Sequence, residues 1–444
     1  MTDSRRKKDH PGDRRRPVLE AGKAALAFAF VAAVVWLAFS LGAWLQERND
    51  PAAYWASLGA QTIFTVIGTG LDPDTVGRPT EADSLRLKVR TAPPAGPLLA
   101  VTEGTEALLL NRRGRIVQRW KSDHQTAFPG SHLPDAAVTW REPVLMPDGD
   151  IIAISRRRSL LRPGDLLGGH HGLGVVRVGP QGDVRWTTRL RAHHVPVRGP
   201  DGGILVLWRR PAGAPDARYP DLHRPFFDEG LARLDPATGR VTRRASFLDL
   251  LAGSGFANLL HHPPMMRDGY HLKGEVFHAN TVRPVSPRAG RNAPFADPGD
   301  LVVSFRNLST AAVLDADTWQ VTTLLRGPWK AQHDVGVRPA GTVAAFDNIA
   351  PDGASRVVVW NPGTGRIVRT FGGAVLNSPT RGARQAMPDG GTLATDARGR
   401  AVRFGPDGAE RWRLVLQADG VFLNSVRRVP RRHAARFLAA PGGR

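Results

Sequence analysis

The chain has 444 residues, of which 41% are hydrophobic, enough to bury the core of one large repeat domain or of two or three smaller domains. It contains no cysteine, which excludes disulfides, a thiol nucleophile and thiolate metal sites. The formal net charge is +21. Dense positive runs stand only near the two ends, so we expect no nucleic-acid partner; a positive field of this size favours anionic substrates.

Near the N-terminus, residues 24–45 form an apolar run without a charged residue, long enough to cross a bilayer as a helix. Residues 1–23 carry eight Lys or Arg against four acids, which predicts that this basic tail is cytoplasmic. A cleaved signal peptide is the alternative, but its apolar region would be shorter, about 7–15 residues. We therefore expect a single-pass anchor in the inner membrane, with the N-terminus inside and the rest of the chain periplasmic or extracytoplasmic.

After the anchor, residues 46–96 are expected to form a juxtamembrane stalk, in which five prolines limit helix formation. Beyond it, short apolar runs alternate with Gly, Pro and Asp turns, a pattern typical of many short strands. One strand–turn–strand unit recurs six times, with turns that contain Gly114, Gly182, Gly239, Trp319, Gly365 and Gly408. A second hairpin signal, Pro-x-Gly, recurs at Gly149, Gly202, Gly341 and Gly390.

Six copies of one unit predict an all-β fold, a six-bladed β-propeller over residues 97–435 that is preceded by one N-terminal transmembrane helix. Residues 436–444 remain as a C-terminal tail. Two long gaps between the repeats, residues 211–228 and 284–299, are expected to be insertions. A tandem of β-sandwiches is the alternative architecture, but a single recurring unit argues against it.

Four histidine or arginine positions stand out as candidates for chemistry. They are the pair His193-His194, His278, Arg306 and His333. Arg306 follows an apolar stretch, where a charged side chain is costly to bury without partners. Neighbouring histidines on a strand point to opposite faces and rarely chelate one ion. We therefore expect no metal site, and nothing in the sequence calls for a cofactor.

The segments around these residues carry a family resemblance through their order and spacing. They read Glu275-Val-Phe-His278-Ala-Asn280, Ser304-Phe-Arg306-Asn307, Gln332-His333-Asp334 and Phe346-Asp347-Asn348. This series resembles the bacterial arylsulfotransferase family, periplasmic β-propellers that move a sulfuryl group from an aryl sulfate to a phenol. Glu275 stands where the family commonly has Asp before the second histidine, and Val195 stands where it often has Asp after the first pair.

The resemblance implies a role for each candidate. His333 matches the family's nucleophile, which is transiently sulfurylated, and Arg306 matches its active-site arginine. His278 matches the second histidine, and His194 or its neighbour His193 matches the first. We expect His193 to take part in substrate binding as well.

The chemistry of the reaction suits these residue types. Sulfuryl transfer resembles phosphoryl transfer, so negative charge on the moving group must be stabilised while the attacking and leaving atoms lie in line. A neutral imidazole can attack sulfur, and another can protonate the leaving phenolate and later deprotonate the acceptor. Asn280 and Asn307 are expected to bind sulfate oxygens, and Asp334 and Asp347 are two candidates for orienting His333.

The sequence thus predicts a membrane-anchored sulfotransferase that uses an aryl sulfate donor and a phenolic or other hydroxyl acceptor, with a sulfohistidine intermediate and no nucleotide-activated sulfate. One alternative is a non-catalytic propeller that scaffolds an envelope complex or binds anionic glycans. Another is a quinoprotein dehydrogenase, for which the sequence shows no acidic Ca²⁺ loop.

Overall fold

The computed structural model describes residues 85–102, 104–131, 133–157, 172–212, 226–260, 275–379, 381–397, 399–416 and 423–439. The expected cytoplasmic tail, the membrane span at residues 24–45 and most of the expected stalk lie outside these residues. Among the described residues, no helix combines the length and the apolar character needed to cross a membrane. All of them belong to one structural unit.

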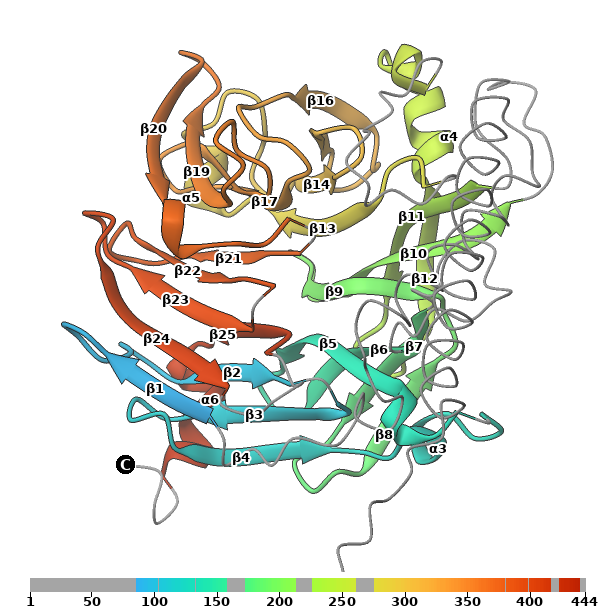
Figure 1. Cartoon of the computed structure of the whole chain (residues 1–444). Helices are drawn as coiled ribbons and strands as arrows, with labels where there is room; N and C mark the ends of the chain where they lie inside the picture. Colours follow the sequence, from blue (N-terminus) through green and yellow to red (C-terminus); the bar gives the residue numbers. More distant parts are fainter. Residues whose placement is uncertain are drawn as a thin grey trace, which may run out of the picture. The chain divides into compact units, whose positions relative to one another are not determined.

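Six antiparallel sheets form this unit, and each is one blade of a β-propeller (Figure 1). Blade 1 contains β25 (Ser425–Arg428), β2 (Leu98–Val101), β3 (Glu106–Leu110) and β4 (Ile116–Lys121). Blade 2 contains β5 (Val138–Leu145), β6 (Ile151–Arg157), β7 (Gly172–Val178) and β8 (Val184–Thr188). Blade 3 contains β9 (Ala192–Arg198), β10 (Ile204–Ala212), β11 (Phe226–Leu234) and β12 (Val241–Ser246).

The remaining blades follow the same order. Blade 4 contains β13 (Ala279–Pro284), β14 (Leu301–Phe305), β15 (Thr310–Leu314) and β16 (Val321–Leu325). Blade 5 contains β17 (His333–Val337), β18 (Val343–Asp347), β19 (Arg356–Asn361) and β20 (Arg366–Phe371). Blade 6 contains β21 (Ala383–Ala386), β22 (Thr392–Thr395), β23 (Arg400–Phe404), β24 (Glu410–Leu416) and an added strand, β1 (Leu85–Val89). The expected all-β, six-bladed propeller is confirmed.

The first strand of each blade is the innermost one. These strands are β25, β5, β9, β13, β17 and β21, and neighbours among them contact one another around the centre (Figure 1). Short helices lie between the strands: α3 (His124–Ala127), η2 (Asp135–Ala137), α4 (Phe247–Ala252), η3 (Ala257–Leu260), α5 (Pro287–Gly290) and η4 (Gly373–Val375). A further helix, α6 (Arg431–Leu438), follows the last strand. The expected insertion at residues 284–299 runs between β13 and β14 and contains α5. Residues 213–225 of the other expected insertion lie outside the described residues.

Two long-range pairings join the ends of the described chain to the propeller, and the first of them closes the ring. The C-terminal strand β25 pairs with β2, with Val426 opposite Ala100, so blade 1 is built from both ends of the described chain. Strand β1 pairs with β24, with Leu87 opposite Leu414. Because β1 lies within residues 46–96, the last part of the expected stalk is folded onto blade 6. Helix α6 reaches past residue 436 into the expected C-terminal tail, and its Phe437 ring lies 5.3 Å from that of Trp120.

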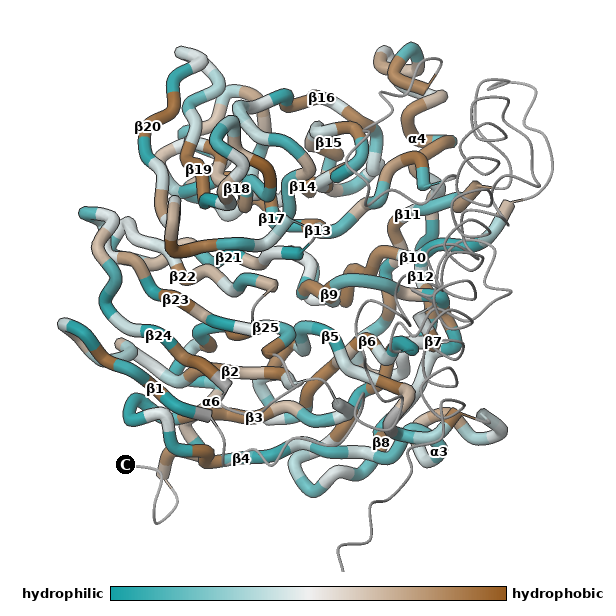
Figure 2. The backbone as a smooth tube through the Cα atoms, viewed as in Figure 1, coloured by the Kyte–Doolittle hydropathy of each residue, from teal (hydrophilic) through white to brown (hydrophobic). Residues whose placement is uncertain are grey.

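Alternate residues of each middle strand face the two neighbouring blades, as the pleat of a strand dictates. In β6, Ile151 and Ala153 belong to the hydrophobic cluster shared with blade 1, whereas Ile152 and Ile154 belong to the cluster shared with blade 3. One such cluster fills each of the six interfaces between blades. Figure 2 shows the hydrophobic stretches along middle strands such as β3, β6 and β23. Stability without disulfides therefore comes from these six buried layers.

The six recurring turns of the sequence all connect the third and fourth strands of a blade. In blade 3 the Asp235 carboxylate accepts hydrogen bonds from the backbone of Ala237 and Thr238, and Gly239 then adopts a φ of 71°. In blade 4 Trp319 takes the equivalent place with a φ of 60°, a left-handed conformation that is costly for a side chain. Its ring is 2% exposed and lies under the guanidinium of Arg243, at 4.2 Å, and this packing offsets the backbone strain.

Because β25 completes blade 1, we expect a Val→Asp substitution to lower the stability of the protein far more in β25 than in β1. Val426 is 2% exposed in β25, whereas Val89 is 49% exposed in β1. Val426→Asp buries an unpaired charge in the innermost strand and should cost about 3–5 kcal/mol or prevent folding. Val89→Asp should change stability by at most about 0.5 kcal/mol. Urea unfolding followed by tryptophan fluorescence measures both, and equal losses would contradict the assignment of β25 as the strand that closes the ring.

Candidate active site

A pocket of about 280 Å³ opens at the centre of the propeller, where the beginnings of the innermost strands meet. Its lining includes His194, His278, Arg306 and His333, the four residues that the sequence singled out for catalysis. His193 and Asn280 line it as well. The structure therefore brings together the four catalytic candidates, which come from three blades and lie up to 139 positions apart in the sequence.

Extra residues in the innermost strands aim these side chains at the pocket. Between His333 and Gly336, β17 has one residue more than β18, and β13 has one extra residue at Asn280 opposite β14. A similar irregularity follows His193 in β9. Such bulges turn a side chain away from the regular alternation of the strand and are common beside active sites.

Backbone strain accompanies the bulges. His194 and His278 have φ values of 62° and 45°, and Asp334, directly after His333, has a φ of 50°. Left-handed conformations are uncommon for residues other than glycine and cost about 1–3 kcal/mol each. Their concentration around one pocket indicates that the fold holds these rings in place at the expense of local stability.

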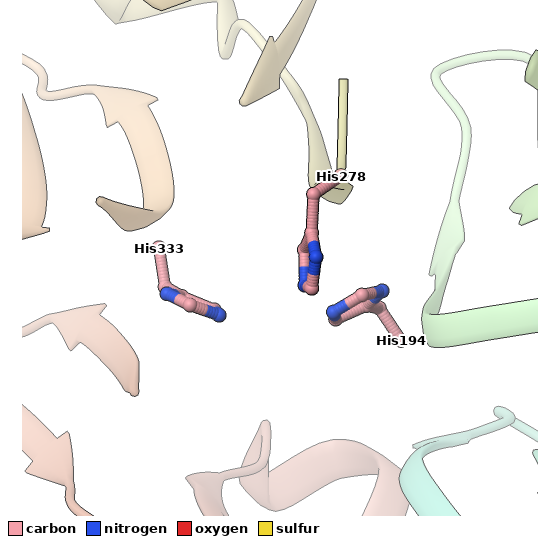
Figure 3. Close-up of side chains that lie close together, drawn as sticks. All are labelled: His194, His278 and His333. Atoms are coloured by element: carbon pink, nitrogen blue, oxygen red, sulfur yellow. The ribbon is translucent and has the colours of Figure 1, made fainter. Parts of the chain in front are cut away.

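The three pocket histidines lie close together. The ring centroids of His194 and His278 are 5.4 Å apart, and that of His333 lies 6.3 Å from the first and 6.4 Å from the second. Figure 3 shows the outer nitrogen, Nε2, of each ring pointing toward a common space. A group the size of a sulfuryl moiety held there can contact all three rings.

His333 is oriented by Asn348. Its Nδ1 lies 2.8 Å from the Asn348 Oδ1. The Asn348 amide nitrogen donates to the carbonyls of Ser378 and Arg381, which leaves Oδ1 as the atom that accepts from His333. Nδ1 of His333 therefore carries the proton, and Nε2 presents a lone pair to the pocket.

The electrostatic surroundings keep His333 neutral. Burial, reinforced by the positive charge of Arg306 and by His278, lowers the pKa of His333 to about 3. At neutral pH the ring is thus an uncharged imidazole with its Nε2 lone pair free for attack. Neither Asp334 nor Asp347 contacts it: Asp334 pairs with Arg283 at 2.9 Å, and Asp347 with Arg356 at 2.9 Å. The orienting residue is Asn348, which is the sequence neighbour of Asp347 and which we did not single out.

His278 is held by the buried carboxylate of Glu275. Its Nδ1 lies 2.6 Å from Glu275 Oε2, and the other oxygen of Glu275 accepts a hydrogen bond from Arg209 at 2.9 Å. The carboxylate therefore fixes the orientation of the ring. Glu275, the departure from the family's usual Asp, reaches the ring from three residues away.

His194 contacts a buried row of polar groups formed by His193 and Glu229. Its Nδ1 lies 2.6 Å from Nδ1 of His193, whose Nε2 faces Glu229 Oε1 at 3.7 Å. Burial, and then the charges of neighbouring groups, hold the pKa of both histidines well below the usual value. Glu229 was not singled out in the sequence, although an acid inside the apolar strand β11 carries the same burial signal as Arg306.

Arg306 comes directly after the last residue of β14, and it is 1% exposed. Its backbone N–H donates to the carbonyl of His278, and its Nη1 donates to Asn307 Oδ1 at 3.3 Å. Asn307 in turn donates to the carbonyl of Glu275 at 2.6 Å. Asn307 therefore connects the arginine to the segment before His278, and it is not among the residues that line the pocket. Asn280 does line it and donates to the carbonyl of Gln332 at 2.7 Å.

The histidine cluster has the spacing of a metal site, since one nitrogen of each of the three rings lies within 4.8 Å of the others. Three imidazoles with partners on their second nitrogen suit zinc. The arginines that line the pocket, Arg306 and Arg141 among them, oppose a dication and favour an anion. This donor set therefore fits an anionic substrate better than a resident metal ion.

Comparison with known proteins supports the resemblance seen in the sequence. A family model described as arylsulfotransferase (ASST) matches residues 179–417, more than half of the chain, and this range contains all four candidate residues. This chain belongs to the arylsulfotransferase family. Membership in this family indicates an aryl sulfotransferase, with small aryl sulfate donors and acceptors. No curated protein matches the sequence.

Several solved structures are similar in fold at low sequence identity. One is a protein of unknown function from Bacteroides caccae, with a TM-score of 0.46 and 12% identity over 75% of this chain and 98% of the other. An inactive virginiamycin B lyase from Staphylococcus aureus with quinupristin has a TM-score of 0.39 and 11% identity, covering 76% and 89% of the two chains. The WD40 domain of Pan2 from Neurospora crassa has a TM-score of 0.36 and 10% identity, covering 72% and 74%.

The buried position of Glu229 predicts a pH-dependent cost to stability. Burial and the charge of Glu275 raise the pKa of Glu229 to about 8. The folded state thus holds this proton more tightly than the unfolded state, so stability falls as pH rises from the ordinary value of 4.5 toward 8. Glu229→Gln, which stays neutral, should match the wild type near pH 4 and unfold at a higher temperature above pH 8. Thermal melts across this range measure the gap, and a gap that does not widen would contradict the burial argument.

Proposed function

We propose that this arylsulfotransferase-family chain moves a sulfuryl group from an aryl sulfate ester to a phenolic or other hydroxyl acceptor through a sulfohistidine at His333. The observation that carries the proposal is the unprotonated Nε2 of His333, which faces the same pocket as Arg306, His194 and His278. A neutral nucleophile beside a buried arginine is what attack on an anionic sulfate ester requires.

In the first half of the reaction, Nε2 of His333 attacks sulfur and the bond between sulfur and the aryl oxygen breaks. The departing phenolate takes a proton from another histidine of the cluster. The sulfurylated ring keeps its Nδ1 proton and becomes cationic, and the Asn348 oxygen at 2.8 Å stabilises that charge. Arg306 neutralises the negative charge on the sulfuryl oxygens during the transfer.

In the second half, the acceptor hydroxyl gives its proton to a histidine and attacks sulfur, and the bond between sulfur and Nε2 breaks. His333 returns to its neutral form with Nδ1 still hydrogen-bonded to Asn348. The two halves share one geometry because the pocket presents the same groups to the leaving and the attacking oxygen. The covalent intermediate divides one difficult displacement into two easier steps.

We also propose where in the cell the propeller lies. Residues 24–45 would anchor the chain in the inner membrane with the propeller outside the cytoplasm. Nucleotide-activated sulfate is not expected there, so an aryl sulfate ester is the natural donor. The pocket would then open to the envelope, and its acceptor would be a molecule of that compartment.

Replacing the proposed nucleophile should abolish turnover. We expect His333→Ala to lose 4-nitrophenol release from 4-nitrophenyl sulfate in the presence of phenol by at least about 10³-fold, because no other group in the pocket forms the intermediate. Arg306→Lys should lose about 10²-fold, since a point charge replaces the planar guanidinium. Absorbance of nitrophenolate measures both.

His433→Ala is the matched control, because His433 lies on α6 and does not line the pocket. It should turn over like the wild type. The assay runs in the presence of EDTA, and loss of wild-type turnover on chelation would assign the histidine cluster to a metal instead. Binding of aryl sulfate without turnover by the wild type would favour a non-catalytic propeller that binds anionic glycans.

A further inference from the structure

The proposed transfer moves a proton twice. The leaving phenolate takes one proton, and the acceptor hydroxyl later gives one up. Two of the rings that face the pocket bind a second proton weakly. Burial keeps the pKa of His194 well below its usual value and lowers that of His333 to about 3. A site that handles protons at neutral pH therefore needs a group that binds them more tightly, connected to the pocket by closely spaced polar groups.

Such a connection runs outward from His194. Its Nδ1 lies 2.6 Å from Nδ1 of His193, which is 4% exposed. On the other side of the His193 ring, Nε2 faces Oε1 of Glu229 at 3.7 Å, and Glu229 is 1% exposed. Within the described part of the chain, neither of these two atoms has a hydrogen-bond partner. A buried donor or acceptor without a partner costs about 1–3 kcal/mol, so this pair is not explained by stability.

We propose that Glu229 stores the proton of the transfer reaction and exchanges it with the substrate oxygens through His193 and His194. The inference rests on the proposed sulfuryl transfer and adds to it the route of the proton. Residues of β11, β9 and the pocket thereby act as one relay, in which His193 and His194 lie at hydrogen-bond distance and the 3.7 Å between Glu229 and His193 has to shorten when the proton moves. His194 is the member that touches the substrate.

The relay has two balanced states. In the first, Glu229 is protonated and donates to Nε2 of His193, whose Nδ1–H donates to His194, so that His194 Nε2–H faces the pocket. When the leaving phenolate takes that proton, each ring passes one proton on, and Glu229 ends as a carboxylate. The acceptor hydroxyl later reverses the sequence: its proton goes to His194 Nε2, and one proton returns to Glu229. Neither imidazole has to remain charged, which suits a pocket lined by arginines.

The charges around Glu229 suit this role. It faces Arg209 on β10, His193 on β9, and Glu275 and His278 before β13. Burial, and then the charge of Glu275, outweigh Arg209 and raise the pKa of Glu229 to about 8. Phenols have a pKa of about 10, so an acid in this range can protonate a phenolate and still be regenerated at neutral pH.

Two donors with different leaving groups test the relay. Nitrophenolate departs without a proton, whereas the phenolate of phenyl sulfate needs one. In the full-length chain we expect Glu229→Gln to lower kcat/KM for phenyl sulfate by about 10²-fold while leaving the pre-steady-state burst with 4-nitrophenyl sulfate within about threefold of the wild type. Glu106→Gln, an acid-to-amide change at the start of β3, where Glu106 pairs with Arg119 and does not line the pocket, should change neither rate.

The pH profile separates a relay from a structural effect. For the wild type, kcat/KM with phenyl sulfate should fall above pH 8, where Glu229 loses its proton. Glu229→Gln should show no such fall in kcat/KM above pH 8. Equal rates for the variant and the wild type with phenyl sulfate, or equal losses with both donors, would overturn the relay. Absence of a burst in the wild type would overturn the transfer reaction itself and the relay with it.

Discussion

The carboxylate of Asp334 holds the centre of the propeller together. It accepts hydrogen bonds from Arg283 of β13 and Arg427 of β25, and from the backbone N–H of Arg384 in β21. Arg427 also reaches Glu142 of β5. With Asp334 in β17, five of the six innermost strands thus meet at one buried charge network, and the arginines hold the pKa of Asp334 well below its usual value. Removing one partner from such a network leaves the other charges buried and unpaired, which is costly. The network therefore fixes how the blades meet.

The geometry of the candidate active site follows from this charge network. Asp334 directly follows His333, and its left-handed backbone and the bulge in β17 turn the histidine ring toward the pocket. Asn348 then selects the tautomer. The same pattern, a bulge or a left-handed residue backed by a buried polar partner, positions His278 and His194. The propeller therefore supplies rigid strand ends, and local departures from regular geometry supply the chemistry.

Much of this arrangement could be predicted from the sequence, because the six turns repeat the same Asp and Gly chemistry and the family motifs mark His333 and Arg306. The partners behind the rings were missed. Asn348 lies in a motif we quoted, but its role depends on two carbonyls from the connection between β20 and β21. Strand β1 could not be recognised because its partner, β24, is more than 300 residues away, and such pairings leave no local pattern. Glu229 shows only as an acid in an apolar strand.

Detection of the covalent intermediate tests the central claim most directly. The full-length chain is pulsed with 4-nitrophenyl sulfate without an acceptor, quenched in alkali, where a bond between nitrogen and sulfur survives, and digested for mass spectrometry. The account predicts a sulfuryl adduct on His333 that disappears when phenol is added before the quench. An adduct on a different residue, or full turnover without any adduct, would contradict it.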